Sequence, residues 1–168
     1  MIGEDMPHWY VTDLLSYDSD TGLFTWKMST GSQKAGSRAG VVDKESGYVR
    51  ISIDRKTYKA HRLAWFYVHK RWPAQNIDHI NHDRADNRLV NLREVTQKQN
   101  TQAMKKRVNT KSKFKGITPY KYKPGFFVAQ IRYDGKQRKI GIFDSELAAH
   151  EAYCAEARKR FGEYFCAG

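Results

Sequence analysis

Residues 77–100, IDHINHDRADNRLVNLREVTQKQN, constrain the fold and chemistry of this chain more than any other stretch. After a short apolar step, an acid and an imidazole stand side by side at Asp78 and His79. Asparagines follow at Asn91 and Asn100. An Asp-His pair alone is common in polar loops, but its spacing to the two asparagines favours a built site.

The secondary structure of this stretch is predicted as strand, loop, strand and helix. Residues 76–80 and 92–95 have the composition of short strands, with polar residues between them. Thr96 followed by Gln99 forms a capping box, which predicts a helix over residues 97–104. Asn100 therefore falls in the first helical turn. Upstream, residues 16–22 are turn-rich, strands are expected at 23–26 and 48–53, and an apolar helix is expected at 61–70.

These residue types suit phosphate chemistry. Asp78 and Asn100 are hard oxygen donors, which suit Mg²⁺ or Mn²⁺ with water and substrate phosphate as the other ligands. His79 can act as a general base towards water near neutral pH. Neighbours in a strand point to opposite faces, although at a strand end both can approach one pocket.

The same stretch resembles the HNH nuclease motif, specifically that of phage and intron-encoded homing endonucleases. The resemblance implies a ββα-metal (His-Me finger) fold around one divalent ion. His79 resembles the general base, Asp78 and Asn100 resemble the metal ligands, and Asn91 resembles the asparagine that fixes the loop and orients the histidine. Many members have His where this chain has Asn100, which favours Mg²⁺ or Mn²⁺ over zinc or nickel. The resemblance covers roughly residues 10–100, including LSYDSDTGLFTWK and YKAHRLAWFYVHKRWP.

The activity implied by this resemblance is hydrolysis of phosphodiester bonds, leaving 5′-phosphate and 3′-hydroxyl ends. We expect a homing endonuclease that nicks one strand.

Other polar residues nearby have two interpretations. His82, Asp83 and Asp86 are expected to supply turn polarity rather than ligands, and His61 and His69 to be packing or surface residues. Arg88 and Arg93 could contact phosphate or close salt bridges.

The basic residues are concentrated downstream. The chain has 168 residues and a formal net charge of +12, which suggests a polyanionic partner, nucleic acid before anionic membrane. Between residues 101 and 139, twelve lysines and arginines accompany a single acid, Asp134. Residues 105–115 are predicted to form a basic linker that tracks phosphates. Its candidate DNA-binding residues are Lys105, Lys106, Arg107, Lys111, Lys113 and Lys115.

The remaining segment predicts three strands, at 117–122, 126–133 and 138–143, and a helix from Asp144 or Ser145 to about 161. Ala148, Ala152 and Ala155 are expected to line the buried face of that helix. The segment resembles the AP2 DNA-binding domain through KGITPY, FFVAQIR, KIGIFDSELAAHEAY and FGEYF. Alternation places Phe127, Ala129, Ile131, Ile140 and Ile142 inward. The residues expected to face DNA are Thr118, Tyr120, Gln130, Arg132, Gln137 and Lys139.

We therefore predict an α+β protein with a nuclease domain at 1–104, a linker at 105–115 and an AP2-like domain at 116–168. The expected partner is duplex DNA, with no membrane and no obligatory protein partner, bound by a monomer in the cytoplasm of a bacterial host. Cys154 and Cys166 make no zinc knuckles, so one Mg²⁺ or Mn²⁺ and no structural zinc is expected. Two alternatives remain open: a non-cleaving DNA-binding regulator that uses the HNH fold as a scaffold, and an RNA-binding protein.

Overall fold

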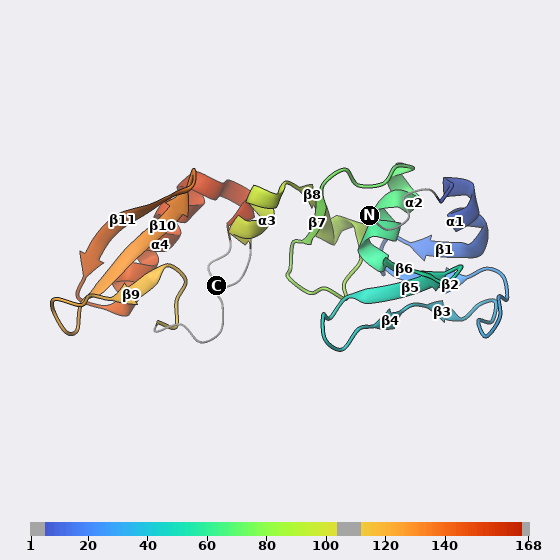
Figure 1. Ribbon diagram of the computed structural model, residues 1–168, viewed down its shortest axis with the longest axis horizontal. Helices are drawn as coiled ribbons and strands as arrows, with labels where there is room; N and C mark the ends of the chain where they lie inside the picture. Colours follow the sequence, from blue (N-terminus) through green and yellow to red (C-terminus); the bar gives the residue numbers. More distant parts are fainter. Residues whose placement is uncertain (1–5, 104–111, 166–168) are drawn as a thin grey trace. The chain divides into compact units, whose positions relative to one another are not determined.

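The computed structural model describes residues 6–103 and 112–165 (Figure 1). The chain divides into two compact units, Met1–Thr96 and Gln97–Gly168, which are described separately. This division groups the helix that follows Thr96 with the second unit, before the domain end predicted at residue 104. The three predicted domains stay a prediction, and linker residues 105–111 lie outside the described ranges.

The first unit is built from short antiparallel strands and helices (Figure 1). Its strands form the sheets β1-β2-β3, β4-β5-β6 and β7-β8. In chain order the elements are α1 (His8–Leu14), β1 (Leu15–Asp18), β2 (Leu23–Trp26), β3 (Arg38–Ala39), β4 (Val41–Val42), β5 (Val49–Ile53), β6 (Lys56–Lys59), α2 (Ala60–His69), β7 (Asn76–His79), the 3₁₀ helix η1 (Leu89–Asn91) and β8 (Leu92–Val95).

Strands β2, β5, β7 and β8 and helix α2 lie at the predicted positions because the apolar pattern is clear. In β5, Val49, Ile51 and Ile53 are buried while the residues between them are exposed. That alternation is typical of a strand with one face on the core. Strand β1 differs from the prediction of a turn over residues 16–22, because its first residues pair with β2, Leu15 opposite Trp26. The turn begins only after Asp18.

The core of the first unit brings α2 against the sheets and against the loop before β7. Leu63 and Ala64 of α2 are fully buried. Phe66 of the same helix stacks on Trp72, with ring centroids 4.3 Å apart. Ile77 and Leu92, one from each strand of the β7-β8 pair, belong to the same apolar cluster. The strand that ends at His79 is therefore anchored on the core.

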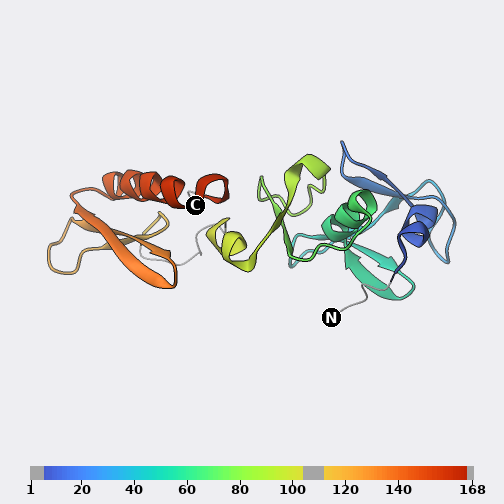
Figure 2. The same cartoon turned by 90° about the horizontal axis from the view of Figure 1, so that it is seen from above.

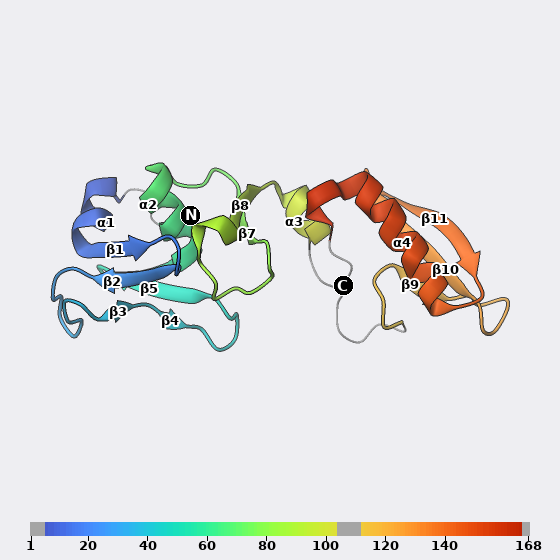
Figure 3. The ribbon, with the colours of Figure 1, turned by 180° about the vertical axis from the view of Figure 1, so that it is seen from behind.

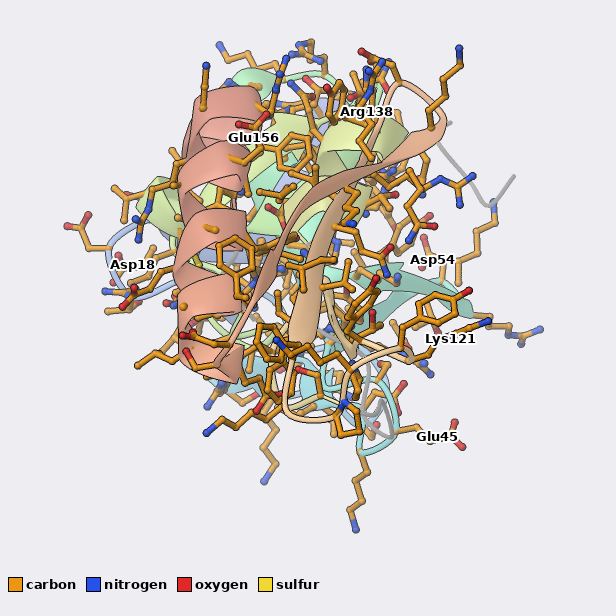
Figure 4. All side chains as sticks on the ribbon, turned by 90° about the vertical axis from the view of Figure 1, so that its left-hand side faces the viewer. Asp18, Glu45, Asp54, Lys121, Arg138 and Glu156 are labelled. Carbon is orange, nitrogen blue, oxygen red and sulfur yellow. The ribbon has the colours of Figure 1, made fainter. Side chains whose placement is uncertain are left out.

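The second unit contains α3 (Gln97–Ala103), β9 (Ile117–Pro119), β10 (Phe127–Tyr133), β11 (Lys136–Phe143), α4 (Glu146–Phe161) and the 3₁₀ helix η2 (Gly162–Tyr164). The strands form an antiparallel sheet in the order β11-β10-β9. Helix α4 lies along one face of this sheet (Figures 2 and 3). In Figure 4, Glu156 lies on α4 at one side of the strands and Lys121 at the other.

The buried face of α4 differs from the predicted alanine stripe. Its buried residues are Ala149, Tyr153, Cys154 and Ala157, whereas Ala155 is exposed. The large ring of Tyr153 fits because Gly116 has no side chain: a Cβ there would lie 2.4 Å from the ring. The predicted cap is confirmed at Ser145, whose Oγ accepts a hydrogen bond from the Ala148 amide at 3.1 Å.

A β-bulge changes the faces of β11. Ala129 pairs with Gly141 and Gln130 pairs with Lys139, so Ile140 is an extra residue in the ladder. Ile140 and Phe143 pack on the core of the second unit. Ile142 instead pairs with Val128, on the face away from Ala129, so its predicted inward position is wrong. Simple alternation fails here because one added residue reverses the faces beyond it.

Candidate active site

The Asp-His pair ends strand β7, which pairs with β8 in a two-stranded sheet. Asp78 lies opposite Arg93 and His79 lies opposite Leu92. Burial alternates along β7, so that Ile77 and His79 are buried while Asp78 is partly exposed. The two functional side chains therefore leave the strand on opposite faces, His79 towards the core and Asp78 towards Arg93.

His79 is held in a buried aromatic and polar pocket. Its ring meets His61 edge-on, with centroids 4.9 Å apart, and lies 5.9 Å from the Tyr48 ring. Its Nε2 lies 3.4 Å from Oδ1 of Asn87. The side chain is 4% exposed, and this burial lowers the pKa of His79 below 6.5. At neutral pH the imidazole is therefore uncharged and able to accept a proton.

Asn91 joins the two ends of the loop that links β7 to β8. Its Nδ2 donates to the Asp86 carbonyl at 2.8 Å, and its Oδ1 accepts from the Asn81 amide at 2.9 Å. Its own carbonyl accepts from the Ile80 amide at 2.9 Å. These contacts are to the loop next to His79, whereas the amide that hydrogen-bonds the His79 ring is that of Asn87, whose Oδ1 lies near Nε2.

The acidic residues of this loop hold turns. Asp83 Oδ1 accepts from the Ala85 amide at 2.9 Å, and Asp86 pairs with Arg88 at 2.6 Å. The hydrogen bonds from Arg88 lower the pKa of Asp86 to about 2. The geometry favours turn polarity over metal ligation for both carboxylates. For Arg88 it favours the salt bridge over a phosphate contact.

Asp78 is paired with Arg93 across the strands. Both Nε and Nη2 of Arg93 donate to Oδ2 of Asp78, at 3.0 and 2.8 Å. Among the described residues no hydrogen bond to Oδ1 is found, so this oxygen is placed to serve as a ligand. A carboxylate oxygen is a donor that Mg²⁺ prefers, and the residues present therefore fit a hard divalent ion. No cluster of three or more His, Cys, Asp or Glu side chains suited to a metal occurs in the described residues.

Asn100 lies in helix α3, which begins directly after Thr96 as the capping box predicted. It is partly buried. Because α3 belongs to the second unit, the pairing of Asn100 with Asp78 around one ion stays a prediction.

Two cations flank the ring that covers His79. The Lys59 ammonium lies 4.4 Å and the Arg84 guanidinium 4.9 Å from the Tyr48 ring centroid. Arg84 also donates to the Ser46 carbonyl at 2.9 Å. The electrostatic environment beside His79 is therefore suited to an anionic substrate.

The residues predicted to face DNA share one side of the second unit's sheet. Gln130 pairs with Lys139 and Arg132 pairs with Gln137. Nε2 of Gln130 donates to the Thr118 hydroxyl at 3.4 Å, and Lys139 lies 5.9 Å from the Tyr120 ring centroid. The six side chains thus gather on the face opposite α4, and we call them the polar sheet face.

The predicted linker residues behave differently. Lys105, Lys106, Arg107 and Lys111 lie outside the described residues. Lys113 is exposed, and its backbone amide donates to Glu146 of α4 at 3.1 Å. The adjacent Phe114 ring stacks on His150 of α4, with centroids 4.1 Å apart. Residues 112–115 therefore pack onto the second unit, because Phe114 supplies apolar area that an extended linker would leave in water.

Several residues at His79 were not predicted as part of the site. Asn87 is 2% exposed and contacts the imidazole directly, yet it stands in a loop of similar polar residues. His61 was expected to pack, and it packs on His79 itself. Tyr48 lies on the loop before β5, far away in the sequence. The only local sign in the sequence was that Asn87 is a further asparagine close to His79.

The comparisons with known proteins place one family over this region. The family model of HNH endonucleases matches residues 58–102, which include α2, β7, β8 and all but the last residue of α3. The match supports a nuclease of the HNH type acting on DNA. Neither the search of curated proteins nor that of solved structures gave a match.

Of the helices in the described ranges, none has the length and apolar character needed to cross a membrane.

Proposed function

We propose that this protein is a divalent-metal-dependent endonuclease that hydrolyses phosphodiester bonds in duplex DNA. The observation that carries the proposal is the buried, neutral imidazole of His79 at the end of β7, within the region matched by the HNH endonuclease family. A buried imidazole held by an amide and two rings suits a general base, because its charge state and orientation are set before substrate arrives.

In the proposed reaction, His79 takes a proton from the water that attacks the scissile phosphorus. The Asp78 side chain leaves the strand on the face opposite to His79. This suits a role on the side of the phosphate away from the attacking water. Asn91 keeps the loop beside the base closed through its contacts with Asn81 and Asp86. Lys59 and Arg84 lie where they can attract the phosphate backbone.

One Mg²⁺ or Mn²⁺ is the proposed cofactor, with Asp78 and Asn100 as its protein ligands. The chemistry that such an ion supplies when bound is stabilisation of charge on the leaving 3′ oxygen. The two bonds from Arg93 are both made to Oδ2 of Asp78, which supports Oδ1 as the ligand atom of that residue. Arg93 keeps the carboxylate oriented by occupying Oδ2.

The second unit is proposed to bind the DNA through the polar sheet face, in the manner expected of an AP2-like domain. A binding module joined to a cutter raises the local concentration of the cutter without new contacts at the scissile bond. We also propose that the protein nicks one strand and that it acts in the homing of a phage or intron element.

The test is conversion of a supercoiled plasmid to nicked circles with and without Mg²⁺. We expect metal-dependent nicking by the native chain and loss of most cleavage, with DNA binding retained, in His79→Ala. General base catalysis contributes about 10²- to 10⁴-fold, so the loss should reach that size. His69→Ala is the matched control, because His69 is an exposed histidine on α2. Undiminished nicking by His79→Ala would refute the assignment of the base.

A DNA-binding regulator without cleavage is the alternative. The Asp78–Arg93 ion pair is compatible with it, because the carboxylate already has a cationic partner. Binding of duplex DNA with no nicking in either Mg²⁺ or Mn²⁺ would favour the regulator. A clear preference for single-stranded RNA over duplex DNA in competition would contradict both functions.

A further inference from the structure

We propose that Asn87 is a positioning residue that selects the tautomer of His79, and that the turn between β1 and β2 holds Asn87 in place. The catalytic meaning of this inference rests on the proposed function, since it concerns the base of that reaction. The tautomer itself is a property of the folded chain and can be measured without DNA or metal.

The amide orientation of Asn87 follows from its two contacts. Its Nδ2 donates to the Ala85 carbonyl at 3.0 Å, which leaves Oδ1 as the atom 3.4 Å from Nε2 of His79. An amide oxygen only accepts hydrogen bonds, so Nε2 must carry the proton. In a neutral imidazole the other nitrogen, Nδ1, then holds the lone pair that accepts a proton from water.

The hydrogen bond between Asn87 and His79 is long, but its surroundings strengthen it. Asn87 and His79 are 2% and 4% exposed, so water competes little for either group. Catalytic hydrogen bonds are often long in the free enzyme and shorten when substrate binds. The rings of His61 and Tyr48 limit the tilt of the imidazole. Among the described residues, none other than Asn87 hydrogen-bonds the His79 ring, so only Asn87 distinguishes its two nitrogens.

The hairpin of β1 and β2 contacts the backbone at Asn87 and at the two residues that follow it. The Tyr17 hydroxyl donates to the Asn87 carbonyl at 2.8 Å, and the Leu89 amide donates to the Ser19 carbonyl at 3.1 Å. Gly22 lies directly against this backbone, where a Cβ would sit 2.4 Å from the Arg88 nitrogen. The site therefore depends on a hairpin more than fifty residues upstream in the sequence.

The first experiment reads the tautomer by long-range ¹H–¹⁵N NMR of histidine-labelled protein, near pH 8. The His79 signals are assigned from their loss in His79→Gln. We expect the Nε2–H tautomer in the native chain and in Asn87→Asp, which keeps an oxygen acceptor. We expect a mixture, or the Nδ1–H form, in Asn87→Leu. An Nδ1–H tautomer in the native chain, or no change in Asn87→Leu, would overturn the inference.

The second experiment measures nicking under single-turnover conditions at saturating DNA. Asn87→Leu should lower the rate by about 100-fold, the lower end of a general base contribution, with the Kd for DNA unchanged. Asn87→Asp should recover most of that rate. A merely structural role predicts instead that Asn87→Asp and Asn87→Leu lose activity together and that the tautomer stays the same.

A pair of glycine variants tests the hairpin. Gly22 and Gly36 both have positive φ, +73° and +81°, but only Gly22 faces neighbouring atoms within 4 Å. Gly22→Ala should shift the His79 tautomer and slow nicking, whereas Gly36→Ala, with similar backbone strain, should do neither. Equal effects of the two variants would overturn the role of the turn. If the native chain shows no nicking with any metal, the proposed function fails, while the spectra still decide the assignment of Asn87.

Discussion

Two buried imidazoles, His79 and His61, dominate the chemistry of this protein at the scale of single residues. Burial is the largest cause of the lowered pKa of each, and for His61 it lowers the value to about 2. The Nδ1 atom of His61 is buried and, among the described residues, has no hydrogen-bond partner. Both rings are therefore neutral at physiological pH. Protonation of His61 would destabilise the fold, and protonation of His79 would remove the proposed base.

The first prediction concerns the pH dependence of nicking. Because the pKa of His79 lies below 6.5, the proposed base stays neutral until the pH falls through that lowered value. The acidic limb of the nicking rate in Mg²⁺ should therefore have its midpoint below about pH 6.5. His69→Ala should follow the same profile. An acidic limb with a midpoint above about pH 6.5 would contradict the assignment.

The second prediction concerns the stability contributed by His61. Its pKa is about 2 in the folded chain and 6.5 ordinarily, so the unfolded chain binds more protons between these values. The free energy of unfolding should be highest above pH 6.5 and fall on acidification by about 1.4 kcal/mol per pH unit for this group.

His61→Phe keeps a ring and removes the titration. The difference between the two chains in urea unfolding from about pH 7 to about pH 5 reports the His61 contribution, because His79 is present in both chains and carboxylates titrate mostly below that window. A parallel decline of stability in the native chain and His61→Phe would count against burial as the cause.

At the scale of elements, caps and small residues decide how helix and sheet meet. Ser145 caps α4, and Gly116 admits the Tyr153 ring from that helix. In the first unit, the β1-β2 turn supports the loop that carries Asn87. The cap at Ser145 is local, whereas the contact of Gly116 with Tyr153 and the support of the Asn87 loop join segments far apart in the sequence.

The third prediction tests the cap. Ser145→Ala removes the side-chain acceptor for the Ala148 amide and should lower the free energy of unfolding of the second unit by about 1 kcal/mol. Ser145→Asp keeps an acceptor and adds a favourable charge at the helix N-terminus, so it should retain the native value. Chemical denaturation followed by circular dichroism measures both. Equal destabilisation by the two substitutions would show that the hydroxyl does not act as a cap.

At the scale of the whole molecule, the net charge of +12 is the dominant feature. A net positive charge favours association with any polyanion. The position of each lysine or arginine decides whether it contributes to DNA binding. Arg132 and Lys139 extend from the polar sheet face, while Lys34 and Lys44 are exposed in the first unit.

The fourth prediction compares two double variants with the same change in charge. Arg132→Gln with Lys139→Gln should weaken binding to duplex DNA and reduce the slope of log K against log salt by about 0.9 for each phosphate that is no longer neutralised. Lys34→Gln with Lys44→Gln should change the affinity far less. Fluorescence anisotropy over a salt series measures both. Equal effects would mean that net charge, rather than the polar sheet face, carries the binding.

Local patterns predicted the elements well. The strands at β5, β7 and β8 and the helix α2 follow from alternation and apolar spacing, which act over a few residues. The errors arose where a choice depended on distant atoms. The buried stripe of α4 centres on Tyr153 because Gly116 leaves room for the ring, and Ile142 changes face because of the bulge at Ile140.

The amino-acid sequence was sufficient for the chemical inventory: an acid beside an imidazole, two spaced asparagines, and a basic second half. It was also sufficient for the strand-loop-strand-helix order, because turn residues and the capping pair act locally. The folded chain was needed to see that Arg93 holds one oxygen of Asp78, and that Asn87 rather than Asn91 contacts the His79 ring. Burial, which sets the charge of that ring, is a sum over residues far apart in the chain, and no local pattern encodes it.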